Sequence, residues 1–204
     1  PIVISTAFCR PGKDNINTKQ YNIENLPFKI CDNPLDDLYK HRLVSAVVWN
    51  KLFRKSAIRR NRFIEGIYYE DWPFTACIFS EINRFATINE KLYIYNTSSP
   101  SIIRSSFSIK KIHDYICGIR YVYNYFMTQK KQKQWQTIRK KLISLSLKMT
   151  LSKIFKSTSN KRELEEYFAQ EYQKLVNDGI FSFYDLTFKI KIRLLRLKWN
   201  LRHK

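Results

Sequence analysis

Residues 66–74 read Gly-Ile-Tyr-Tyr-Glu-Asp-Trp-Pro-Phe and place two adjacent carboxylates among aromatic rings. Pro73 suits the first turn of an α-helix, because the backbone N–H groups of that turn have no intrahelical partner to lose. Apolar side chains continue beyond it with mainly helical spacing as far as Ile82. The stretch therefore predicts a loop that delivers Glu70 and Asp71 to the start of a helix.

Strand-like and helix-like segments alternate on both sides of this stretch. Residues 2–9 form an apolar run typical of a buried strand, and residues 87–95 alternate in the manner of a strand. A proline and two acids at 33–37 are typical of a helix entrance. The remaining segments are a polar loop at 11–25, a short apolar segment at 47–53 and a basic stretch at 54–62, expected on a solvated helix. This order favours an α/β layer arrangement for residues 1–105.

The second half changes to long helical patterns, expected at 109–130, 133–156 and 161–178. We therefore expect two regions, 1–105 and a basic helical region at 106–204. The tail at 181–204 carries two apolar helical stripes on opposite sides, although 189–194 also alternates in the manner of a strand. A two-sided helix facing the protein and a membrane or partner is the preferred interpretation, and a packed terminal helix with a basic rim is the alternative.

Charge and composition limit the class of protein. The chain has 204 residues and a formal net charge of +20, with 22 basic and 7 acidic residues in 106–204. Such a field attracts phosphates of nucleic acids, lipid headgroups or charged ligands. No stretch approaches the ~20 apolar residues of a membrane span, and the four separated cysteines predict reduced, mostly buried thiols in a cytosolic protein. The first residue is Pro1, which suggests that the start has been removed.

The carboxylate pair has two interpretations that do not exclude each other. An acid ahead of Pro73 lies at the positive end of the helix dipole, where it caps the helix and stays ionised. An ionised carboxylate can also take a proton from a hydroxyl nucleophile, as a general base does. A cleft around the carboxylate could then have aromatic walls, formed by Tyr68, Tyr69, Trp72 and Phe74. Aromatic faces of this kind are also surfaces on which sugar rings stack.

Four ordered blocks support a more specific interpretation: 48–56 (VWNKLFRKS), 63–74 (FIEGIYYEDWPF), 92–95 (LYIY) and 101–104 (SIIR). In that order and spacing they resemble the acceptor half of bacterial family 2 glycosyltransferases. The resemblance covers roughly residues 1–105 and implies part of a GT-A type α/β fold, which binds nucleotide-diphospho-sugars.

The same resemblance implies roles for individual residues. Asp71 would be the catalytic base, and Glu70 beside it would help to shape the acceptor site. Acceptor-binding positions are expected at Trp49, Lys51, Tyr69 and Trp72, with a wall or core role favoured for Trp49. The segment from Tyr95 to Arg104 resembles a mobile stretch that closes over the donor diphosphate, which gives Ser101 and Arg104 as donor-binding residues.

The sequence departs from this family where the donor should bind. The family's nucleotide-binding half, with a D-x-D motif for a divalent cation, would precede residue 1. Asp36 and Asp37 are rejected as a substitute because they open a helix and follow the strand that they should precede. The cofactor implied is Mg²⁺ or Mn²⁺ with ligands in the absent half, so the segment alone is expected to be inactive.

The function expected from the resemblance is an inverting glycosyltransferase that moves a sugar from a nucleotide sugar to a lipopolysaccharide or capsule acceptor. The basic helices would hold the enzyme on the anionic inner face of the bacterial plasma membrane. One alternative is a nucleic-acid binder, suggested by Tyr121, Tyr123, Tyr125 and Trp135 among basic residues, although such spacing is more often core. Another is a module for a partner enzyme or a homodimer. His41, His113 and His203 have no ligand or triad spacing and are expected to be structural or exposed.

Overall fold

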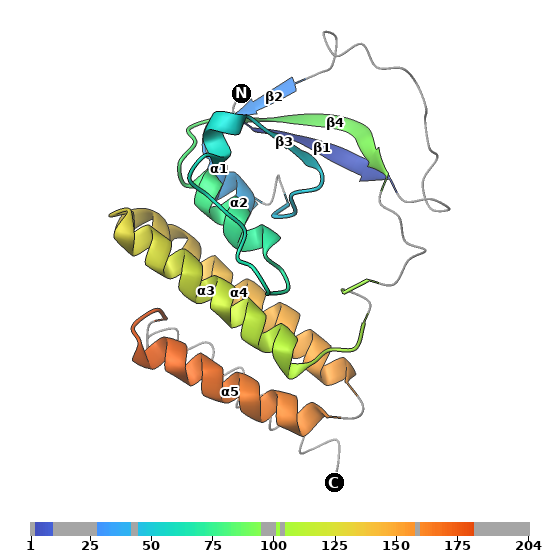
Figure 1. Ribbon diagram of the computed structural model, residues 1–204, viewed down its shortest axis with the longest axis vertical. Coiled ribbons are helices and arrows are strands. Elements are labelled where there is room, and N and C mark those ends of the chain that lie inside the picture. The colour runs from blue at the N-terminus through green and yellow to red at the C-terminus, as the bar shows by residue number, and fades with distance from the viewer. Residues whose placement is uncertain are drawn as a thin grey trace.

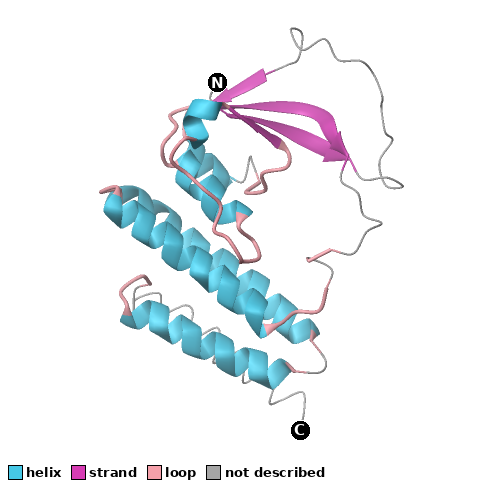
Figure 2. Cartoon of the chain, in the orientation of Figure 1, coloured by secondary structure: helices cyan, strands magenta, loops and turns pink. Residues whose placement is uncertain are grey.

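The computed structural model describes residues 3–9, 28–41, 45–94, 101–102, 105–157 and 160–181. Within this part of the chain the elements form layers, in which a small sheet is followed by helix α2, then by the pair α3 and α4, and then by α5 (Figure 1, Figure 2). The fold is therefore an α/β arrangement that continues into a helical region. The loop expected at 11–25, Arg104 and the tail beyond residue 181 lie outside the described residues.

The sheet has four strands in the order β2-β4-β1-β3. These are β1 (Val3–Cys9), β2 (Phe28–Cys31), β3 (Lys51–Phe53) and β4 (Phe85–Ile94). The central pair β1 and β4 is parallel, and both outer pairs are antiparallel. Cys31 and Phe85 are directly opposite each other and buried, whereas Leu52 on the edge strand β3 is 69% exposed. The strands expected at 2–9 and 87–95 are confirmed, and the second begins two residues earlier than expected.

Helix α2 (Asp71–Phe79) lies between the sheet and α3 and is buried along its length from Trp72 to Phe79. Its sequence contains no charged residue after Asp71. A helix that is apolar all round has no solvated face and belongs in a core. Its one hydroxyl side chain, Thr75, is satisfied because Oγ1 donates a hydrogen bond to the Ala46 carbonyl oxygen at 2.7 Å. The helix expected after the carboxylate pair is confirmed.

The three long helices are α3 (Ile109–Thr128), α4 (Gln132–Lys156) and α5 (Lys161–Asn177). Each predicted range agrees with the observed one to within two residues. Ser108 caps α3 by accepting a hydrogen bond from the Lys111 backbone N–H, and Gly179 follows α5 with a positive φ of 69°. One core of buried side chains runs from Cys31 through α2 to Phe181 in the turn after α5, so it crosses the boundary expected at residue 105.

Gly118 allows α2 and α3 to approach each other closely. A Cβ atom built at this position would lie 2.6 Å from Cζ2 of Trp72 and 3.0 Å from Cγ of Pro73. Real Cβ atoms do not approach so closely, and neither ring lies at the end of a flexible side chain. Glycine at 118 therefore sets the separation of the two helices.

Two helix predictions were too generous. The entrance at 33–37 leads to a three-residue helix α1 (Pro34–Asp36) and a π-helical turn (Asp37–His41) rather than to a regular helix. The basic stretch at 54–62 forms only a short 3-10 turn (Lys55–Ile58), because its side chains are largely solvated and give no apolar face to bury. In the part of the chain described, no helix combines the length and apolar character needed to cross a membrane.

Candidate active site

The loop before α2 adopts an unusual backbone conformation. Gly66 has a φ of +75°, and Tyr69 has a φ of +65°. Positive φ is ordinary for glycine, but a bulky residue there is strained by about 1–3 kcal/mol and needs support from its surroundings. The strained residue lies two positions before Asp71, so the conformation of this loop leads directly into the carboxylate pair.

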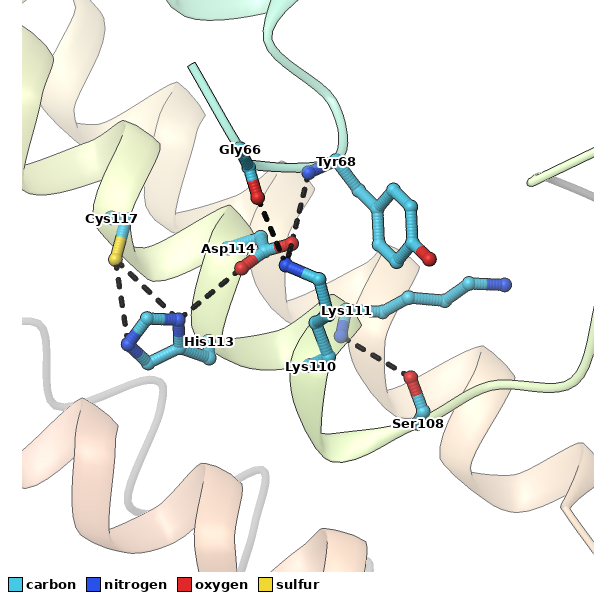
Figure 3. Close-up of polar contacts among 8 residues, drawn as sticks. All are labelled: Gly66, Tyr68, Ser108, Lys110, Lys111, His113, Asp114 and Cys117. Carbon is cyan, nitrogen blue, oxygen red and sulfur yellow. Dashed lines mark hydrogen bonds and ion pairs between the residues drawn. The ribbon is translucent and has the colours of Figure 1, made fainter. Parts of the chain in front are cut away.

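Asp114 of α3 supplies much of that support (Figure 3). Its side chain is 2% exposed, and Oδ2 accepts hydrogen bonds from the Tyr68 backbone N–H at 2.9 Å and from Lys110 Nζ at 2.8 Å. Lys110 also donates to the Gly66 carbonyl oxygen at 3.0 Å, and its ammonium lies 5.0 Å from the Tyr68 ring centroid. His113 completes the set, with Nδ1 3.2 Å from Oδ1 of Asp114.

These contacts determine the charge state of Asp114. Burial raises its pKa, but the hydrogen bonds from Lys110, Tyr68 and His113 outweigh burial and hold the pKa below the ordinary value of aspartate. Asp114 is thus an ionised structural acid that joins α3 to residues 66–68. It is also the single acidic residue between Glu90 and Glu163, a sequence signal that the motif analysis missed.

Asp71 has the opposite electrostatic character. Its half-buried carboxyl has a raised pKa, caused first by burial and then by the neighbouring charge of Glu70. Hydrogen bonds from the backbone N–H groups of Trp72 and Asp71 and the charge of Lys51 lower the pKa only in part. The dipole argument predicted an acid held ionised, whereas desolvation wins here and makes the carboxylate a stronger base.

The two acids lie at different positions relative to the start of the helix. Glu70 occupies the position before the helix, but its side chain makes no capping hydrogen bond. Asp71 lies in the first turn and takes the backbone hydrogen bonds described above. Asp71 therefore combines a cap's hydrogen bonds with a base's raised pKa, and Glu70 contributes negative charge beside it.

Lys51 is the cation coupled to Asp71. Burial lowers the pKa of Lys51 to about 8, and the charge of Asp71 opposes that shift. Its ammonium donates to the Val47 carbonyl oxygen and, at 3.0 Å, to Oδ1 of Asn50, which is itself buried. Lys51 begins β3, so the sheet and α2 bring two residues together that lie 20 positions apart. Lys51 and Asp71 are thus electrostatically coupled, and the acceptor-binding role of Lys51 stays a prediction.

The aromatic residues expected around the pair separate into different environments. Trp49 packs on Tyr93 of β4, with ring centroids 4.7 Å apart, and the wall or core role favoured for it stays a prediction. The half-buried Tyr69 faces Tyr115 of α3 at 6.3 Å and Lys153 of α4, whose ammonium is 5.5 Å from its ring centroid. Tyr69 therefore belongs to the helical side of the site and Trp49 to the sheet side.

The acceptor-binding role expected for Trp72 does not fit its position. Trp72 is 8% exposed, and its ring packs against Tyr115 at 5.3 Å and over Gly118. The side chain fills the space between α2 and α3, so no ring face is left for a sugar. Phe74 is likewise buried and stacks on Phe63 at 4.2 Å.

Ser101 is held in a turn, where its carbonyl oxygen accepts from the Ser105 backbone N–H at 2.9 Å. Arg104 lies outside the described residues. A residue that the motif analysis missed, Lys111, organises this segment: its ammonium donates to the carbonyl oxygens of Ile102, Ser105 and Ser106 and to the hydroxyl of Ser105, at 2.6 to 3.0 Å. The sequence around Lys111 does not distinguish it from a surface lysine, but this residue is 3% exposed.

The other predicted features are placed as follows. Among the described residues, no group of three or more His, Cys, Asp and Glu side chains is arranged to hold a metal ion. Asp36 is the last residue of α1, and Asp37 begins the π-helical turn after it. Cys31, Cys77 and Cys117 are free thiols, the first two of them buried. A pocket of about 470 Å³ lies at the opposite end of α2, near Ser80 and the α1 turn, and includes none of the predicted site residues.

The aromatic residues that suggested nucleic-acid binding belong to the core. Trp135 is buried and packs edge-on against Tyr123 at 5.3 Å. Tyr121, Tyr123 and Tyr125 are half-buried against the same core. No face of stacked, exposed rings therefore accompanies the basic residues in the described part of α3 and α4.

Comparison with protein-family models gives no match, and comparison with curated protein sequences gives no relative.

Proposed function

We propose that this protein is an inverting glycosyltransferase in which Asp71 is the general base. The observation that carries the proposal is the environment of Asp71, a half-buried carboxylate of increased basicity, coupled to Lys51 and placed on a loop that Asp114 fixes. A general base works best when its pKa is brought towards the working pH, which burial does here.

In the proposed reaction, a carboxylate oxygen of Asp71 takes the proton of an acceptor hydroxyl. The hydroxyl oxygen forms a bond to the anomeric carbon, and the bond from that carbon to the nucleotide diphosphate breaks on the opposite face. The diphosphate leaves with the bonding electron pair, so the configuration is inverted in a single displacement. Lys51 balances the charge of the ionised base before the proton is taken, because an opposite charge nearby favours the ionised form.

The donor, the acceptor and the cation proposed next rest on the resemblance and not on the geometry of the site. The donor would be a nucleotide sugar and the acceptor a bacterial surface glycan such as lipopolysaccharide or capsule. The divalent cation would be Mg²⁺ or Mn²⁺. The described residues supply no ligand set for it, and the roles of Asp71 and Lys51 do not depend on it. The strongly basic second half would hold the enzyme on an anionic membrane surface on the cytoplasmic side.

The test is release of nucleotide from a panel of nucleotide sugars by the gene product that includes any residues upstream of Pro1, with Mg²⁺ or Mn²⁺ and a glycan acceptor. The wild type is compared with Asp71→Asn, which keeps the size and hydrogen-bonding shape of the side chain but removes its basicity. Loss of transfer in Asp71→Asn with an unchanged circular dichroism spectrum supports the proposal. Equal rates in the two proteins would reject Asp71 as the base.

A further inference from the structure

Two lysines of the helical region contact the segment before α3, and within the described part of the chain neither has a carboxylate partner. Lys111, near the start of α3, is buried, and its ammonium donates to neutral oxygens of Ile102, Ser105 and Ser106. Lys153, near the end of α4, lies with its ammonium 5.5 Å from the ring centroids of both Phe107 and Tyr69. Lys111 and Lys153 thus both contact the segment that ends at Phe107.

The nearby acid is already engaged elsewhere. Asp114 pairs with Lys110 and His113, and no carboxylate of the described residues forms an ion pair with Lys111 or Lys153. Burial lowers the pKa of both lysines, and the positive charge of Lys153 lowers that of Lys111 further. A pair of partly desolvated ammonium groups without an anion is unfavourable, and an anion that binds there relieves the repulsion.

The two lysines are not equivalent as ligands. The Lys111 ammonium has four oxygen acceptors for its three N–H groups, so its donors are used and it contributes charge alone. Lys153 has one long contact, 3.5 Å to the Tyr69 hydroxyl, besides the two ring faces. The N–H groups of Lys153 can therefore donate hydrogen bonds to an anion without breaking a short hydrogen bond.

We propose that Lys153, assisted by the charge of Lys111, binds a phosphate group carried by the acceptor. Phosphate is the anion indicated because a compact ammonium on a flexible stem binds it as a point charge. The acceptor side is indicated because Lys153 contacts Tyr69, which lies two residues before the candidate base, and that base must touch the acceptor. This assignment to the acceptor rests on the proposed function, whereas phosphate binding itself does not.

The experiment is titration calorimetry of the 204-residue chain with two probes that distinguish the source of the phosphate. Inorganic phosphate represents a soluble phosphate ester, and phosphatidylcholine vesicles containing a long-chain alkyl phosphate represent a lipid. Lys153→Gln removes the charge, Lys153→Arg retains it, and Lys140→Gln removes the same charge from an exposed position on α4. Lys140 is 13 residues from Lys153, about 20 Å along the helix.

We expect Lys153→Gln to weaken binding roughly tenfold or more, as loss of one charge-assisted contact does, while Lys153→Arg and Lys140→Gln stay within about twofold of the wild type. The probe that binds more tightly then identifies the soluble or the lipid source. Equal weakening by Lys153→Gln and Lys140→Gln would show attraction by net charge alone and overturn the proposal, as would the absence of saturable binding to both probes.

One further variant separates this proposal from the proposed function. Asp71→Asn leaves both lysines in place and should bind the probes as the wild type does, whatever its transfer activity. Phosphate binding that survives in Asp71→Asn while transfer never occurs in any variant would retain the phosphate site and reject the glycosyltransferase. Sugar transfer by the wild type without Lys153-dependent phosphate binding would retain the glycosyltransferase and reject the phosphate site.

Discussion

Asp71 at the entrance of α2 and Asp114 in the first part of α3 are the same chemical group in opposite states. Asp114 is almost fully buried, yet its pKa is lowered, because three donors are directed at its oxygens. The pKa of Asp71 is raised, first by burial and then by the charge of Glu70, because its hydrogen bonds and Lys51 do not offset these two effects. Burial raises the pKa of both acids, so the hydrogen-bond donors and cations around each carboxylate decide whether its pKa ends below or above the ordinary value.

The largest expected effect follows from the reactive acid. Asp71→Asn should lower the transfer rate by about 100- to 10,000-fold, because a positioned general base contributes that much to a proton transfer. Asp114→Asn should lower it less, because Asp114 acts through the loop and touches no reacting atom. Steady-state rates of the two variants measure the contrast. A greater loss of transfer rate in Asp114→Asn than in Asp71→Asn would contradict the roles assigned to the two acids.

The next effect concerns stability. Asp114→Asn should lower the free energy of unfolding by about 2 kcal/mol, because it removes the charge from hydrogen bonds at a buried site. The folded-state pKa of Asp114 is lowered, so its stabilisation is present above the unfolded pKa of about 3.9 and is lost as pH falls through the folded value. Urea unfolding of wild type and variant from pH 7 to pH 3 should therefore show a difference that shrinks with acidity.

A packing change on the same helix provides the control for that pH dependence. Gly118→Ala should cost about 1–3 kcal/mol of stability, because the added methyl group meets the rings of Trp72 and Pro73 and the helices must move apart. This loss involves no titratable group, so it should be constant over the pH range in which the Asp114→Asn effect shrinks. A pH-dependent loss in Gly118→Ala would mean that helix separation itself alters the Asp114 contacts.

The smallest effect has the opposite sign. The pKa of Asp71 is raised in the folded state, so ionisation of Asp71 opposes folding above that pKa and Asp71→Asn should raise the melting temperature slightly at pH 7. Differential scanning calorimetry at pH 7 and pH 4 can detect it, with the gain disappearing at the lower pH. A fall in melting temperature would assign Asp71 to the same structural class as Asp114.

The secondary structure could be predicted because its signals are local. Ser108 before α3 and Gly179 after α5 mark helix ends, and alternation over 87–95 identifies β4. The short turns at 34–41 and 55–58 could not be predicted, because nothing in their composition shows how little of each segment finds a surface to pack against.

The sequence suggests the central residues of the candidate site, but it does not reveal the contacts that support them. Asp71 and Lys51 were proposed from the family resemblance and stay predictions. The burial of Trp72 depends on Gly118, 46 positions away, and the Tyr68 backbone bonds Asp114 at the same separation. Contacts so distant in sequence leave no periodic trace. The isolated Asp114 was a usable signal, because a single carboxylate in a basic stretch indicates a specific structural role.

The bond between Asp114 and the Tyr68 backbone also has a consequence for the order of folding. A contact across 46 residues costs more loop-closure entropy than the local contacts of a helix or a hairpin, so it is expected to form after them. During synthesis, residues 66–71 leave the ribosome before the helix that fixes them, so the strained conformation at Tyr69 must form late, when α3 docks. A chain that stops before α3 should therefore retain local helix and strand propensities but never assemble the candidate base in its working environment.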